Sequence, residues 1–188
     1  MDKHYKRFVR DYVHYIDIIF CKAAIIVNRL LEEGGGTYTA FHVRRGEFQY
    51  TPVKIPAEEI IKNVGNKLPS GGLVFIATDE KKKDFFRPIK EKFRKIRYLD
   101  DYMAIADLKG INPNYLGMID QVVCTRGKHF IGTWFSTFTG YITRMRGYLG
   151  HNDSSVWFGD LPHRLSFAFF LSLFNTKFTN IRSNPPSF

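Results

Sequence analysis

The sequence predicts an α/β domain with a mainly parallel sheet. Segments typical of strands alternate with segments typical of helices along most of the 188 residues, and this order favours parallel strands joined by helices. Residues 73–77 are apolar without interruption, as expected of a strand that is buried on both faces. A chain of this length with 44% hydrophobic residues can bury a core of its own. We therefore expect one domain over residues 1–188.

The first third of the chain predicts two helices around one strand. Apolar residues recur every three or four positions over 5–33, which predicts one long amphipathic helix that ends at glycines 34–36. β-Branched and aromatic residues then predict a strand at 37–43. A proline followed by two glutamates predicts that the next helix begins near residue 56 and extends to about residue 68.

The same alternation continues to about residue 150, so we expect the core of the domain over 37–150. Further helices are predicted at 82–94, from 113 onward and at 135–146, and further strands at 96–99 and 128–131. After the core, residues 158–178 are rich in phenylalanine and residues 179–188 are polar. The phenylalanine-rich segment fits either a final core helix or a surface that meets another domain.

The composition narrows the classes of partner. The formal net charge of +10 favours an anionic partner, which leaves open a phosphate-bearing ligand, nucleic acid or an acidic membrane surface. No apolar run approaches the roughly 20 residues that a membrane-spanning helix needs. The two cysteines, Cys21 and Cys124, exclude a disulfide framework and leave open either one disulfide or two buried free thiols.

Polar clusters directly follow three of the predicted strands. These clusters are 42–47, 78–80 and 132–138. Ligands of open α/β sheets bind in the crevice outside the carboxyl ends of the strands. The three clusters therefore predict a ligand site at that edge of the sheet.

Arg44 is the first candidate for contact with phosphate, because a guanidinium stays charged and can bind phosphate oxygens in bidentate fashion. His42 lies two residues earlier on an extended segment, so its side chain points to the same face as that of Arg44. Arg45 points to the opposite face, and we expect it to be structural. The alternatives are that Arg44 and Arg45 form a solvated basic turn and that His42 is an ordinary core histidine.

Further candidate ligand-binding residues are those at the start of a predicted helix and two aspartates. Ser136 and Thr137 begin a predicted helix, where backbone N–H groups attract phosphate, although they also fit an ordinary helix cap. Phe138 can stack on a purine or pack in the core. Asp79 at a strand end and Asp120 in a helix can accept hydrogen bonds from a nucleoside, although periodicity alone gives Asp120 a plain polar-face position.

Several motifs are absent from the sequence. It contains neither a phosphate loop nor a dinucleotide fingerprint, and no Asp-x-Asp pair that would hold a divalent metal under a sugar diphosphate. We therefore expect a site that uses arginine for charge and requires no metal or other cofactor.

The segments 41–50, 75–80, 119–121 and 130–141 together resemble the GDP-fucose protein O-fucosyltransferase family, and most of all its plant and algal branch. The resemblance implies the second half of a GT-B glycosyltransferase, in which two Rossmann-like domains face each other and the second, a three-layer domain, holds GDP. It implies transfer of fucose from GDP-fucose to a protein or glycan hydroxyl with inversion, without a metal. The family works in the Golgi or endoplasmic reticulum lumen, although this chain shows no signal or membrane anchor.

The resemblance also implies roles for individual residues. The family's GDP-fucose contacts fall on His42, Arg44, Asp79, Asp120, Ser136, Thr137 and Phe138. Among these, Arg44 is the catalytic residue, because it stabilises the leaving diphosphate. Glu47 departs from the aspartate that is more usual in the plant branch. The other departure is the missing first domain, which supplies much of the acceptor surface, and no general base can be assigned.

Two other classes of function stay open. A non-catalytic protein that binds anions or nucleic acid would suit the net charge. Against it, 81–83 and 90–97 are expected to be solvated helix faces, so we expect no nucleic-acid partner. A degenerate relative that serves as an interaction partner is the third interpretation.

Overall fold

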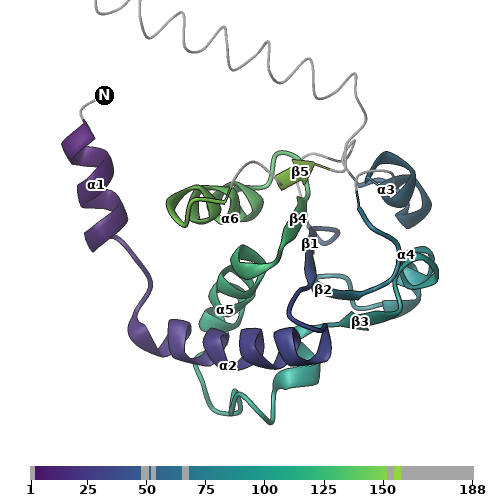
Figure 1. The fold of residues 1–188 in the computed structure, drawn as a ribbon, viewed down its shortest axis with the longest axis horizontal. Helices are drawn as coiled ribbons and strands as arrows, with labels where there is room; N and C mark the ends of the chain where they lie inside the picture. The colour runs from purple at the N-terminus through teal and green to yellow at the C-terminus, as the bar shows by residue number, and fades with distance from the viewer. Residues whose placement is uncertain (1–2, 48–50, 52–53, 65–67, 152–154, 158–188) are drawn as a thin grey trace, which may run out of the picture. The chain divides into compact units, whose positions relative to one another are not determined.

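A computed structural model describes residues 3–47, 51, 54–64, 68–151 and 155–157, all within the unit Met1–Phe158. The predicted α/β fold is confirmed: a five-stranded sheet lies between two layers of helices in a Rossmann-like arrangement (Figure 1). All neighbouring strands are parallel. The strands are β1 (Thr39–Val43), β2 (Leu73–Thr78), β3 (Lys95–Arg97), β4 (His129–Gly132) and β5 (Ser155–Trp157).

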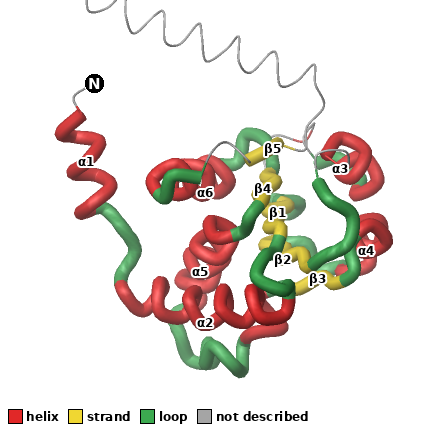
Figure 2. Tube along the Cα trace, in the orientation of Figure 1, coloured by secondary structure: helices red, strands yellow, loops and turns green. Residues whose placement is uncertain are grey.

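The helices cover both faces of the sheet (Figure 2). One face carries α2 (Asp17–Glu33), α5 (Pro113–Arg126) and α6 (Thr137–Tyr148). The other face carries α3 (Ala57–Val64) and α4 (Arg87–Lys92). The remaining helical elements are α1 (Lys3–Tyr12) and the 3₁₀ turns η3 (Lys83–Phe86) and η4 (Leu99–Tyr102).

Two hydrophobic cores lie on the two faces of the sheet. Ala40 and Phe75 belong to the core under α2 and α5, whereas Phe41 and Val74 belong to the core under α3 and α4. Successive strand residues point to opposite faces, and both faces are covered. This explains why the predicted strands are apolar without alternation.

The chain changes direction in the sheet between β1 and β4. The strand order is β3-β2-β1-β4-β5, so the chain builds outward from β1 to β3 and then returns to the other side of β1. The connections after β1 and β4 therefore leave the sheet in different directions. Such a switch point is where open α/β sheets leave room for a ligand.

The prediction of one long helix over 5–33 is wrong, because the helix is interrupted between α1 and α2. Ile16 is extended, with φ −65° and ψ 153°. The interruption lets the Tyr15 hydroxyl donate to Gln121 Oε1 on α5. Of the predicted apolar stripe, Tyr12 and Ile16 are exposed, whereas the part from Ile19 onward is buried. A tertiary contact therefore overrides the helical periodicity.

The other expected elements show smaller differences. The helix predicted at 82–94 is η3 followed by the short helix α4, which has Pro88 near its start. Strand β5 was not predicted. The phenylalanine-rich segment 158–178 and the polar tail 179–188 lie outside the described residues.

The two cysteines form no disulfide. Of the two alternatives that the sequence left open, two buried free thiols holds for Cys124, which is buried, but not for Cys21, which is exposed. In the part of the chain that the structure describes, every helix is too short or too polar to cross a membrane.

A buried arginine joins α6 to the end of α5. Arg146 is only 2% exposed, and its Nη1 donates to the carbonyl oxygens of Thr125 at 3.0 Å and Gly127 at 2.6 Å. Its Nη2 donates to the carbonyl oxygen of Lys128 at 3.3 Å. The last carbonyls of a helix lack partners within the helix. Arg146 satisfies them at α5 and fixes the entry into β4.

Candidate functional site

The turn after β1 is hydrogen-bonded to Thr133, the residue that follows β4. The Arg44 backbone N–H donates to Thr133 Oγ1 at 2.8 Å, and that hydroxyl donates to the His42 carbonyl at 3.1 Å. The Thr133 backbone N–H also donates to the His42 carbonyl at 3.0 Å. The predicted clusters at 42–47 and 132–138 therefore meet at the switch point.

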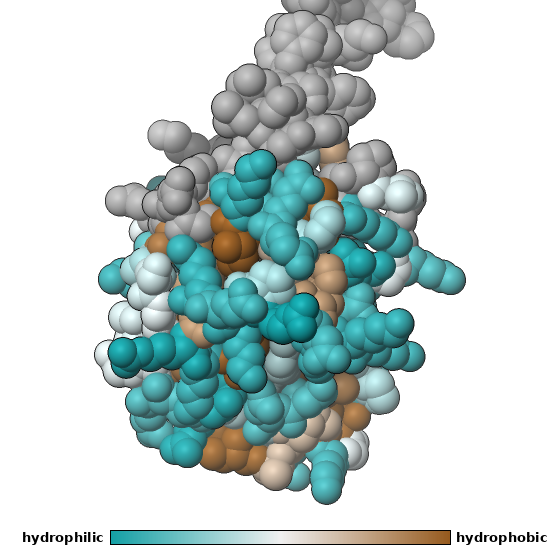
Figure 3. Space-filling view, turned by 90° about the vertical axis from the view of Figure 1, so that its right-hand side faces the viewer, coloured by the Kyte–Doolittle hydropathy of each residue, from teal (hydrophilic) through white to brown (hydrophobic). Residues whose placement is uncertain are grey.

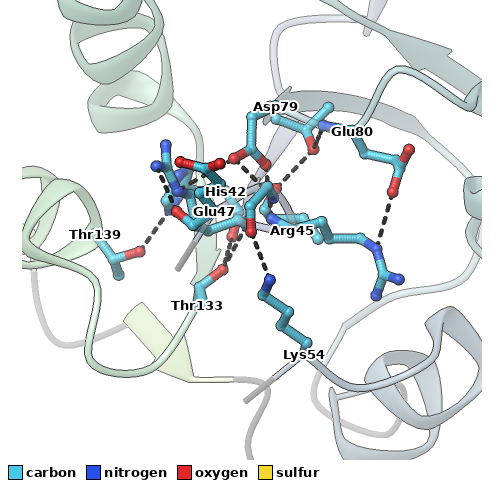
Figure 4. Close-up of polar contacts among 12 residues, drawn as sticks. His42, Arg45, Glu47, Lys54, Asp79, Glu80, Thr133 and Thr139 are labelled. Atoms are coloured by element: carbon cyan, nitrogen blue, oxygen red, sulfur yellow. Dashed lines mark hydrogen bonds and ion pairs between the residues drawn. The ribbon is translucent and has the colours of Figure 1, made fainter. Parts of the chain in front are cut away.

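Asp79 fixes the shape of this turn (Figure 4). Its Oδ1 accepts from the Arg45 backbone N–H at 2.6 Å, and its Oδ2 accepts from the Gly46 N–H at 2.9 Å. Its Oδ2 also forms an ion pair with Arg44 Nε at 3.1 Å. A Cβ atom on Gly46 would lie 2.6 Å from Oδ2, so this approach requires glycine. Asp79 thus positions the arginines of the turn through both of its carboxylate oxygens.

Arg44 and Arg45 differ as predicted. Arg45 is structural: it pairs with Glu80 at 3.0 Å, donates to the Ile55 carbonyl at 3.2 Å and lies 4.0 Å above the Phe85 ring. The Arg44 side chain is 42% exposed. One of its terminal nitrogens donates to the Glu47 carbonyl at 3.1 Å. The guanidinium is therefore oriented but keeps donors for an anionic ligand.

His42 is held neutral under α6. It is 4% exposed, its ring stacks on Phe138 at 4.3 Å, and its Nδ1 is hydrogen-bonded to Thr139 Oγ1 at 2.7 Å. Burial lowers the pKa of His42 to about 3; the nearby Asp79 opposes this shift and Arg44 adds to it. The imidazole is therefore uncharged near neutral pH and can contribute a hydrogen bond to a ligand but no charge.

The start of α6 is open. Ser136 is the N-cap residue, yet its side chain makes no capping hydrogen bond, so the ordinary cap that the sequence allowed is not formed. Thr137, the first helical residue, is exposed. Phe135 takes a left-handed backbone conformation, with φ 55°, that turns the chain into the helix. The first turn of a helix presents free N–H groups and the positive end of the helix dipole.

Asp120 is not the solvated polar-face residue that periodicity allowed. It lies on α5, and its Oδ1 is buried with no hydrogen-bond partner among the described residues. Burial raises the pKa of Asp120 to about 8; the negative Asp100 adds to this shift and Lys83 opposes it. A neutral carboxyl group at this place can both donate and accept hydrogen bonds.

We expect Asp120→Asn to stabilise the free protein at high pH. The folded pKa of about 8 lies above the unfolded value, so protonation stabilises the fold fully below about pH 4 and this contribution is lost as the pH rises towards 8. Asparagine keeps the shape without the charge. The gain in the free energy of unfolding over wild type should increase above pH 5 and reach about 2–5 kcal/mol at pH 8. Urea unfolding across this range measures the difference. The exposed Asp84→Asn is the control, and parallel pH profiles of wild type and Asp120→Asn would contradict the assignment.

Further residues support the site although no prediction singled them out. Thr133 and Thr139 are described above. Gln121 Nε2 donates to the Phe138 carbonyl at 3.2 Å, and Gln121 in turn accepts from Tyr15. Lys54 Nζ donates to the Gly46 carbonyl at 2.5 Å. Thr133 lies in a predicted polar cluster, and Gln121 and Thr139 lie in segments that resemble the family, so only Lys54 had no signal in the sequence.

The structure gathers most of the predicted site residues at one edge of the sheet. Those brought together around the β1 turn and the start of α6 are His42, Arg44, Asp79, Ser136, Thr137 and Phe138. Asp120 stands apart on α5, where the charges that act on it are those of Asp100 and Lys83. Across the described ranges, no three His, Cys, Asp or Glu side chains group as a metal site.

The fold and the site together define a Rossmann-like α/β domain with a cationic turn and an open helix start at its topological switch point. The chain belongs to the GDP-fucose protein O-fucosyltransferase family, whose sequence profile matches residues 1–149. It is 29% identical over 137 residues to GDP-fucose protein O-fucosyltransferase 2 of Drosophila melanogaster, a match that covers 65% of this chain and 26% of that protein. It is 26% identical over 128 residues to the protein of the same name from Caenorhabditis elegans, which covers 65% of this chain and 29% of that protein. The chain thus spans less than a third of the length of these relatives.

Proposed function

We propose that this chain binds GDP-fucose at the switch point and forms the donor half of a fucosyltransferase. The single observation that carries the proposal is the Arg44 guanidinium, oriented by Asp79 at 3.1 Å and left with free donors, at the sheet edge where α6 begins. Membership of the O-fucosyltransferase family supports the choice of donor. The full reaction transfers fucose to a protein or glycan hydroxyl.

The chemistry follows from where charge develops. Cleavage of the bond between fucose and the β-phosphate builds negative charge on the diphosphate. A guanidinium and helix-end N–H groups that are already oriented stabilise this charge without reorganisation. Arg44 therefore acts as the catalytic residue, and no metal is required. The acceptor attacks the opposite face of the sugar, which inverts the anomeric carbon.

The remaining predicted residues bind the donor. His42 is neutral. In the tautomer whose Nδ1 accepts from Thr139, the ring carries a proton on Nε2 that can be donated to a phosphate oxygen. Ser136 and Thr137 supply hydroxyl and backbone donors to the phosphates. Phe138 and Asp120 contact the nucleoside, where the neutral carboxyl of Asp120 can donate as well as accept.

A second GT-B domain completes the enzyme in this proposal. The chain spans only part of its relatives, and the described residues contain no group that we assign as general base. The base and much of the acceptor surface would come from that domain. As in the family, the site of action would be the lumen of the secretory pathway, and nucleic acid is not a partner.

Calorimetric titration with GDP, GDP-fucose and ADP tests the proposal. We expect GDP and GDP-fucose to bind in preference to ADP, and Arg44→Ala to lose about 10- to 100-fold in affinity, the size of one or two charge-assisted hydrogen bonds. Arg144→Ala is the matched control, because Arg144 is an exposed arginine on the outer side of α6. Selective binding that Arg44→Ala leaves unchanged would remove Arg44 from the site.

The same titration at high salt separates this function from polyanion binding. A guanine-selective pocket keeps its preference for GDP over ADP at high salt, whereas binding driven by general charge falls steeply. Loss of all selectivity at high salt would contradict the proposal.

A further inference from the structure

A second cationic feature lies away from the Arg44 turn, in a groove between α4 and β3. The groove has a volume of about 440 Å³. Figure 3 looks onto the α3–α4 side of the molecule, where hydrophilic residues dominate the surface. Six cationic residues and one acidic residue are among those that line the groove: Lys83, Arg87, Lys90, Arg94, Lys95, Arg97 and Asp84.

Half of these cations have no anionic partner among the residues that the structure describes. Lys95 and Arg97 share Glu33, at 2.7 and 2.8 Å. Lys83 lies 3.7 Å from Asp100 and 3.9 Å above the Tyr98 ring. Within the described part of the chain, Arg87, Lys90 and Arg94 form no ion pair, and all three are exposed.

Exposed cations line the groove along η3, α4 and the turn that follows α4. Arg87 and Lys90 are three residues apart on α4 and so lie on one face of that helix. Lys95 and Arg97 on β3 point to the opposite face of the sheet, where both pair with Glu33 of α2. Their register partners on β2 belong to the core under α2 and α5. A cleft lined by one sign of charge concentrates the field and attracts anions of the opposite sign. A row of cations along the groove suits a chain with repeated negative charges better than a single small anion.

The groove also runs along the sheet towards the proposed donor site. Arg94 precedes β3, whereas Tyr98 follows it and Lys83 comes after the carboxyl end of β2. The strands are parallel, so Tyr98 and Lys83 lie at the same edge of the sheet as Arg44 and Asp79. One end of a chain bound along the groove would therefore reach the edge where the donor is proposed to bind.

The lining favours an anionic glycan over nucleic acid or a peptide. Single-stranded nucleic acid needs exposed aromatic faces for stacking, but Phe86 is 1% exposed and Lys83 covers the Tyr98 ring. A peptide is usually held by apolar anchors in pockets, and the exposed side chains of this groove are charged. Carboxylate or sulfate groups on sugars need only the cationic donors that the groove presents.

We propose that the groove between α4 and β3 binds an extended anionic glycan, sulfated or carboxylated. Its role as an acceptor surface rests on the proposed function, whereas the binding itself does not. The three unpaired cations are the residues that determine the affinity. Because they lie outside the Arg44 turn and the start of α6, binding of glycan and of GDP can be measured separately.

The test compares two triple variants of the full chain. Arg87→Gln, Lys90→Gln and Arg94→Gln together remove the unpaired cations, and Lys62→Gln, Lys109→Gln and Arg144→Gln together remove the same charge from exposed positions elsewhere. The probes are labelled oligosaccharides of heparin, alginate and neutral dextran, and single-stranded DNA, followed by fluorescence anisotropy at about 50 mM salt. We expect the groove variant to lose about tenfold or more of the affinity for an anionic oligosaccharide, and the control variant less than about threefold.

The outcomes are distinct. Tighter binding of heparin would identify sulfate as the anionic group that the groove binds, and tighter binding of alginate would identify carboxylate. Either result supports the proposal. Equal losses in the two variants, tighter binding of DNA than of both anionic glycans, or no glycan binding would overturn it. A parallel GDP titration keeps the two proposals apart: we expect GDP binding to be unchanged in the groove variant, and glycan binding without GDP binding would remove only the donor function.

Discussion

Arg146→Met is expected to destabilise the fold by about 3–5 kcal/mol at neutral pH. The methionine fills most of the space but leaves three backbone carbonyls without the donors that Arg146 gives them. These carbonyls belong to the end of α5 and the entry to β4, so the loss falls on the junction of three elements. An unsatisfied buried acceptor costs about 1–3 kcal/mol. Urea unfolding at neutral pH measures the effect.

Two further variants keep this prediction open to refutation. Arg144→Met changes an exposed residue of the same helix and should shift the unfolding free energy by no more than about 0.5 kcal/mol. Arg146→Lys keeps the charge but not the fork of donors, and should fall between wild type and Arg146→Met. If Arg146→Met unfolds within about 1 kcal/mol of wild type, the three hydrogen bonds do not hold the junction together.

Gly132→Ala is expected to weaken GDP binding by at least about tenfold although it adds a single methyl group. A Cβ atom at this position would lie 2.1 Å from Thr139 Cγ2 and 2.8 Å from Thr139 Oγ1. Thr139 is 1% exposed, and its hydroxyl holds His42 at 2.7 Å, so the start of α6 has to move away from the sheet. Overpacking of this kind costs about 1–3 kcal/mol, and here it displaces the first turn of α6 from the Arg44 turn. Calorimetry measures the loss of GDP affinity, and urea unfolding measures the loss of stability.

The glycine of the helix itself is the matched control. Gly140 lies in α6, and a Cβ atom there would have no atom within 4 Å, so Gly140→Ala should stabilise the protein by about 0.5–1 kcal/mol and leave GDP affinity unchanged. Adding Thr139→Ser to Gly132→Ala removes the methyl group with the closest contact and should recover part of the affinity. An unchanged GDP affinity in Gly132→Ala would show that the start of α6 takes no part in binding.

Most of the fold could be predicted from the sequence, because each central strand is buried on both of its faces and each covering helix is buried on one of its faces. This produces local patterns that do not depend on the rest of the chain. The prediction for 5–33 was wrong because the position of Tyr15 is decided by Gln121 on another helix, which no local pattern reveals. Strand β5 has only three residues, too few for a periodic signal.

Some features of the candidate site could likewise be predicted from the sequence, and others could not. Arg44 and Arg45 could be told apart because their opposite directions follow from extended backbone alone. The charges that act on Asp120 come from Asp100 and Lys83, which lie on other elements. The hydrogen bond between Thr139 and His42 joins residues 97 positions apart. Likewise, 90–97 was expected to be a solvated helix face, but the segment ends α4 and forms β3. Lys90 and Arg94 are exposed beside the groove, whereas Lys95 and Arg97 pair with Glu33 on the other face of the sheet.

The distance in sequence between the halves of the candidate site has a consequence for the order of folding. Strands β1 and β2 pair over a separation of about 35 residues, whereas β1 and β4 pair over 90. Closing the longer loop costs about 1 kcal/mol more in chain entropy, so the β1–β2–β3 half can assemble first and β4 with α6 can dock afterwards. The Arg44 turn and the start of α6 come together only after that docking. A nucleotide bound there can slow the unfolding of the chain, but it cannot guide the early steps of its folding.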